Sequence, residues 1–137
     1  MSYGVGAALQ AAVYQELLAD AGVTALVGTA IYDALPAGAL PTTYVTLGPE
    51  DARDRSDQTG AGAEHRFTVT VTTTASGFAG AKDVAAAICD ALIDADLTLT
   101  RGSLVGLWFD RAVAERSGSG GTVRTITLRF RARVEDN

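Results

Sequence analysis

TVRTITLRFRARV, residues 122–134, is the stretch that decides the fold. Apolar and polar side chains alternate along it, as they do in a strand with one buried and one exposed face. The face expected to be buried carries Ile126, Leu128, Phe130, Ala132 and Val134. The opposite face carries threonines and arginines, so helices are expected to cover only the apolar side of the sheet.

Three further strands and two helices are predicted around this segment. The strands are 42–48, 65–75 and 104–115, and the clearest is 65–75, where Phe67, Val69 and Val71 alternate with polar residues. Apolar residues recur at helical spacing in 5–19 and 78–95. The sequence therefore predicts an α+β fold, with two helices on one face of a four-stranded, mostly antiparallel sheet. At 137 residues, the chain is expected to be a single domain, 1–137.

Three shorter segments leave more than one interpretation open. Gly22 is a plausible end for the first helix, and 23–27 is compatible with one more helical turn. Residues 31–33 are compatible with a very short strand. The charged segment 49–63 has no apolar period and ends in a glycine-rich stretch, so it predicts either a long hydrophilic loop or an extended hairpin arm.

Charge is distributed unevenly along the chain. The net charge is −5; residues 1–100 carry four basic and twelve acidic side chains, whereas residues 101–137 carry seven and four. This asymmetry suggests two electrostatically different surfaces suited to contact between copies, or a chance surface distribution. The overall acidity argues against an ordinary free nucleic-acid binder.

The expected compartment is a reducing one. Cys89 is the only cysteine, the start of the chain has no basic signal-peptide region, and no apolar run approaches a membrane span. We expect a cytoplasmic product with no membrane contact.

Residues with reactive side chains are few. His65, the only histidine, is expected at the surface or at a strand edge, and Cys89 lies on an apolar helix stripe, where a buried, inert thiol is expected. The acidic run 50–57 contains two arginines and lacks the EF-hand ligand spacing. No glycine-rich stretch follows the strand–glycine–helix order of a phosphate loop. The sequence therefore predicts no enzyme, no metal and no cofactor.

Charged side chains in two segments are the candidates for subunit or partner contacts. These candidates are Asp51, Arg53, Asp54, Arg55, Arg129, Arg131 and Arg133. The first four lie in a segment too polar for the core, which would either order against a partner or form a disordered surface loop.

The three arginines lie on one face of the last strand, and three interpretations of them are open. They could form a salt-bridged subunit interface. They could form a solvated face, balanced by cross-strand acids such as Asp110 or Glu115. They could also line a surface that tolerates passing nucleic acid.

Short motifs along the whole chain carry a family resemblance. In order, they are VTALVG at 23–28, IYD at 31–33, PTTYVTLG at 41–48, AK at 81–82 and LRFRA at 128–132. Their order and spacing resemble the tail terminator, or tail completion, proteins of phages with long non-contractile tails. The versions in prophages and gene transfer agents of alphaproteobacteria are especially similar.

The resemblance implies an α+β subunit of a hexameric ring at the head-proximal end of the tail tube, within the virion. Such a ring, assembled in the host cytoplasm, ends tube polymerisation and joins the tail to a head-side connector or stopper. DNA passes through its lumen without sequence-specific binding, and the family has no catalytic residues. The alternatives are another ring protein of the head–tail joint, a small DNA-binding regulator, or a small enzyme.

Overall fold

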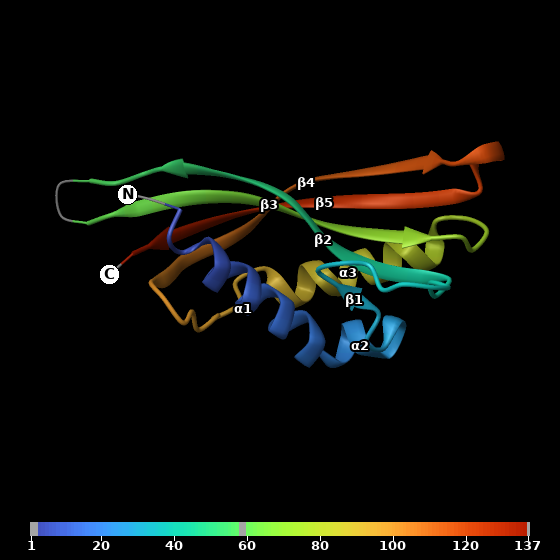
Figure 1. Ribbon diagram of the computed structural model, residues 1–137, viewed down its shortest axis with the longest axis horizontal. Helices are drawn as coiled ribbons and strands as arrows, with labels where there is room; N and C mark the ends of the chain where they lie inside the picture. Colours follow the sequence, from blue (N-terminus) through green and yellow to red (C-terminus); the bar gives the residue numbers. More distant parts are fainter. Residues whose placement is uncertain (1–2, 58–59, 137) are drawn as a thin grey trace.

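A single sheet with all helices on one face forms the molecule (Figure 1). The computed structural model describes residues 3–57 and 60–136. Its elements in chain order are α1 Gly6–Ala19, α2 Ala21–Val27, β1 Ile31–Tyr32, β2 Thr43–Asp54, β3 Gly62–Thr73, α3 Ala79–Leu92, β4 Ser103–Ser117, a 3-10 turn Ser119–Gly121, and β5 Val123–Glu135. The sheet order is β1-β2-β3-β5-β4; β1 runs parallel to β2, and the other neighbouring strands are antiparallel.

The α+β prediction is confirmed, but the described chain has five strands and three helices instead of four and two. The additional strand, β1, pairs Ile31 with Val45 and makes the sheet mixed. The additional helix arises at Asp20, whose extended backbone ends α1 and whose carboxylate accepts a hydrogen bond from Val23 N at 3.0 Å. Asp20 is therefore the N-cap of α2. The prediction that Gly22 ends the first helix is wrong, because Gly22 lies inside α2.

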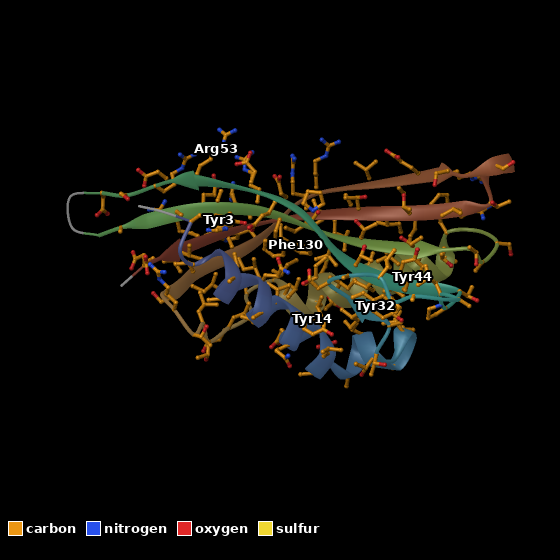
Figure 2. All side chains as sticks on the ribbon, in the orientation of Figure 1. Tyr3, Tyr14, Tyr32, Tyr44, Arg53 and Phe130 are labelled. Atoms are coloured by element: carbon orange, nitrogen blue, oxygen red, sulfur yellow. The ribbon has the colours of Figure 1, made fainter. Side chains whose placement is uncertain are left out.

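The core lies between the sheet and the helices. The predicted apolar face of β5 is buried along its length, and Phe130 packs between Phe67 and Phe109, with ring centroids 5.6 and 6.1 Å away. Figure 2 shows Phe130 on the helix side of the sheet. Leu9 on α1 and Ile88 on α3 are buried beneath the sheet, as the helical spacing of their stripes requires. The remaining face of the sheet, which we call the open face, has no helix over it (Figure 1).

The charged segment is a hairpin arm, since β2 continues to Asp54. The expected end of this strand at Gly48 is wrong because the chain passes Gly48 and Pro49 as a β-bulge. A Cβ on Gly48 would collide with the Thr68 hydroxyl, and that hydroxyl donates to the Pro49 carbonyl at 2.9 Å. The β2–β3 arm and the β4–β5 hairpin project beyond the helices at opposite ends of the molecule (Figure 1).

Among the described residues, no helix has the length and apolar character needed to cross a membrane.

Candidate assembly interface

The arginines of β5 lie on the open face, together with charged residues of the neighbouring strands. Arg131 stands opposite Arg66 of β3 on one side and Trp108 of β4 on the other. Its guanidinium lies 5.3 Å from the Trp108 ring centroid, within cation–π range. On β2, Arg53 points away from the helices (Figure 2).

Glu64 brings the two predicted sets of contact residues together. Its side chain, 14% exposed, lies 3.4 Å from Arg55 of the arm, 3.4 Å from Arg131 of β5 and 3.7 Å from Arg66 of β3. One carboxylate therefore forms ion pairs with three guanidinium groups. Segments far apart in the sequence thus form one continuous charged surface.

Arg129 and Arg133 also have partners within the chain. Arg129 Nε donates to Asp110 Oδ2 at 2.8 Å, and Asp110 is one of the cross-strand acids that the sequence suggested. Arg133 Nη2 donates to the backbone carbonyl of Arg55 at 2.6 Å. These contacts hold the side chains of Arg129 and Arg133 in place within the subunit.

The remaining arm residues differ in how firmly they are held. Asp54 Oδ1 accepts hydrogen bonds from the Ser56 hydroxyl at 2.6 Å and from Ser56 N at 3.0 Å, and these bonds lower the pKa of the Asp54 carboxyl. Asp54 therefore shapes the arm near its tip. Arg53 and Asp51, 3.5 Å apart and each 60% exposed, form a weak pair that leaves both available to a partner.

Glu64→Gln is expected to lower the free energy of unfolding by about 1 kcal/mol, after allowance for solvent screening of the half-exposed arginines. The substitution keeps the shape of the side chain but removes the charge shared by three guanidinium groups. Urea unfolding measures the difference. Asp51→Asn is the matched control and should cost less than about 0.3 kcal/mol, because both members of its ion pair are mostly exposed to solvent. Equal losses in the two variants would contradict a special role for Glu64.

The outer edge of β4 is a surface that the sequence did not reveal. No charged residue occurs in the segment 104–109, and Val105, Trp108 and Phe109 are 58, 41 and 44% exposed. β4 is the last strand of the sheet, so its outer backbone groups have no strand partner in the described chain. The strand was predicted, but its position at an edge depends on the sheet order, which local patterns do not encode.

The reactive residues do not form a catalytic constellation. The expectation of an exposed His65 is wrong, because its side chain is 0% exposed. Its ring stacks on the Tyr3 ring, with the two centroids 5.7 Å apart, and its Nδ1 lies 3.3 Å from Glu50 Oε2. In the arm, β2 runs beside β3 and Ala52 pairs with His65, so His65 lies within the sheet and not at its edge, which the loop interpretation did not anticipate. Cys89 is half-buried instead of buried, and desolvation followed by the charge of Asp90 raises the pKa of its thiol. Within 3–57 and 60–136, no group of His, Cys, Asp or Glu is arranged to hold a metal ion.

Comparison with known proteins identifies the family. The family model described as "Tail completion protein gp17" matches residues 11–135, which is most of the chain. This chain belongs to the tail completion protein gp17 family. The resemblance inferred from the short motifs is therefore confirmed, and the function of this tail completion family member is structural.

A solved structure supports this assignment. The chain is 63% identical to a chain in a structure entitled "Virion of native gene transfer agent (GTA) particle". The match covers 98% of this chain and 99% of the other, with a TM-score of 0.93. No curated protein sequence matched this tail completion family member.

Proposed function

We propose that six copies of this chain form a ring at the head-proximal end of a virion tail tube. The ring ends tube polymerisation and joins the tail to a head-side connector or stopper. The observation that carries this proposal is the near-complete, 63% identical match to a chain of a gene transfer agent virion. The gp17 family match over residues 11–135 supports it independently.

The regions at the two opposite edges of the sheet differ in the way that a head-to-tail ring requires. A closed ring of identical subunits needs two different, complementary surfaces on each subunit. One is the bare β4 edge with its apolar segment 104–109. On the opposite side of the sheet, a shallow groove between α1 and β2 is lined by Tyr3, Ala7, Ala11, Tyr14 and Leu47, among others. We assign the β4 edge and this groove to neighbouring subunits of the ring.

The open face suits a hydrated lumen through which DNA passes. Glu64 and Asp110 partly neutralise the charges of Arg131 and Arg129 within the subunit, and the Arg55 carbonyl fixes the position of Arg133. A surface of this kind reduces repulsion of the phosphate backbone without binding it tightly. We therefore assign Arg129, Arg131 and Arg133 to the lumen-facing surface.

The β2–β3 arm is assigned to a protein partner. It projects beyond the helices and exposes Asp51 and Arg53, while Asp54 and Arg55 fix its shape (Figure 1). Extended arms of this kind can reach across a joint between rings, which would bring this one to the tail tube protein or to the connector. The proposed function involves no catalysis. The burial of His65 supports this proposal, as does the raised pKa of Cys89, which favours its unreactive thiol form.

Particles from a strain lacking the gene are expected to contain overlong or heterogeneous tails detached from DNA-filled heads. The reason is that nothing would stop the tube at its proper length or provide the joint. Negative-stain electron microscopy measures tail length and head attachment. Tails of normal length that remain joined to heads would refute the terminator function.

The same strain tests the proposed ring contacts by complementation. Val105→Lys on the β4 edge and Ala11→Lys in the groove should each fail to restore normal tails, although both subunits remain folded by circular dichroism. Leu35→Lys is the control, because Leu35 is similarly exposed at 53% but lies in the loop between β1 and β2. Restoration by all three variants would refute these surfaces while leaving the function itself in place.

A further inference from the structure

Three cationic side chains converge on one aromatic ring near the turn of the β4–β5 hairpin. Arg124, Lys82 and Arg116 place their charged groups 5.7, 6.0 and 6.0 Å from the centroid of the Phe78 ring. Arg116 and Arg124 come from the two strands of the hairpin, whereas Phe78 and Lys82 belong to the start of α3. We call these four residues the Phe78 cluster.

The arrangement is electrostatically unfavourable for the free subunit. Arg116 stands directly opposite Arg124 in the β4–β5 ladder, and like charges in directly opposed positions destabilise a sheet. None of the three cations forms an ion pair with an acidic side chain anywhere in the described part of the protein. Cation–π contact with one ring offsets only part of this repulsion.

Arg124 is nevertheless held firmly in position. Its Nη1 donates to the Ala75 carbonyl at 3.1 Å. Its Nε is buried and has no hydrogen-bond partner among the described residues. Because the guanidinium is anchored through Nη1, its Nη2 group is held in a fixed position from which it can donate to an oxyanion.

The start of α3 adds to the positive potential. Phe78 occupies the N-cap position without a capping side chain, and the first turn of the helix contains no acidic residue. The first backbone N–H groups of the 14-residue helix therefore have no side-chain acceptor from the cap. The uncapped helix end and the three cations converge on the same place.

From this geometry we infer that the Phe78 cluster is a docking site for an acidic segment of another protein chain, held through its carboxylates. Carboxylates fit the fork of an arginine and would remove the repulsion between Arg116 and Arg124. DNA is the less suitable occupant because the three cations meet at one ring, whereas cations that follow a nucleic-acid strand are spread along a groove. The net charge of −5 also opposes approach of a polyanion as large as DNA.

A fluorescein-labelled hexaglutamate peptide tests this inference on the isolated full-length protein by fluorescence anisotropy at low salt. The wild type should bind the peptide, and the Arg116→Gln, Arg124→Gln double variant should raise the Kd about tenfold. The Arg101→Gln, Arg111→Gln double variant removes the same charge from exposed positions outside the cluster and should change the Kd less than about twofold. Absence of peptide binding, or an equal loss in both double variants, would overturn the inference.

A labelled DNA duplex provides the competing arm of the experiment. Duplex binding that is tighter than peptide binding and is lost in the Arg116→Gln, Arg124→Gln variant would reassign the cluster to nucleic acid.

Arg116→Gln alone should raise the thermal unfolding midpoint of the free protein by about 2 °C, because it relieves the cross-strand repulsion. A lower midpoint would contradict that repulsion. Neither result depends on ring formation, so failure here leaves the proposed terminator function untouched.

Discussion

Phe130→Ala is expected to lower the free energy of unfolding by about 4 kcal/mol. Phe130 is fully buried and packs against Phe67 and Phe109 between the sheet and the helices. Truncation removes both the transfer free energy of the ring and its contacts with these neighbours, and β5 is a central strand that cannot close the resulting cavity without moving the sheet. Urea unfolding followed by circular dichroism measures the change.

Phe109→Ala is the matched control on the adjacent strand. The Phe109 ring is 44% exposed, so its truncation should cost only about 1 kcal/mol in the isolated subunit. A loss at Phe109 as large as that at Phe130 would show that the core extends to the β4 edge in the free protein. A small loss at Phe130 would contradict its position at the centre of the core.

Gly102→Ala should lower the free energy of unfolding by about 3 kcal/mol. Gly102 precedes β4 with φ of +74°, a conformation that disfavours alanine, and an added Cβ would collide with the Glu135 carbonyl and lie 3.0 Å from Val5 Cγ2. The start of β4, the end of β5 and the segment before α1 would all have to shift. Thermal unfolding compares the variant with the wild type.

Gly28→Ala separates the two causes of this loss. Gly28 also has a positive φ, of +60°, but nothing lies within 4 Å of the position that an added Cβ would take. Its ψ of −127° lies outside the left-handed helical region, so its substitution should cost only the conformational penalty, about 2 kcal/mol. If both variants lost the same stability, the collision at Gly102 would be relieved by local movement and backbone conformation alone would explain the effect.

Local sequence patterns were sufficient for the elements that bury one face. The alternation in 122–134 correctly predicted which side of β5 is buried, because a strand period of two allows only that assignment once helices cover the sheet. The apolar stripes of α1 and α3 likewise predicted which face of each helix is buried. Patterns failed where a non-local contact decides the conformation. The bulge at Gly48 and Pro49 depends on Thr68, a residue of the next strand, and local pattern alone could not decide whether 49–63 forms a loop or a hairpin arm.

The candidate contact surface was predictable in part. Sequence spacing placed the arginines of β5 on one face, but it could not bring Arg55 and Arg131 to the same carboxylate of Glu64, since that depends on strand register. The Phe78 cluster could not be predicted from the sequence for the same reason. Its four residues are spread over positions 78–124, and only the β4–β5 ladder and the position of α3 unite them.

The bare edge of β4 makes the behaviour of the free protein depend on how much of it a cell contains. The segment 104–109 combines an unpaired strand edge with a run of uncharged residues, which is the signature of segments that nucleate cross-β aggregates. In the proposed ring a neighbouring subunit would cover this edge, whereas excess unassembled subunits would leave it open to one another. Synthesis matched to the number of tails under construction would therefore favour correct assembly, and overproduction in isolation should lead to fibrous or amorphous precipitate.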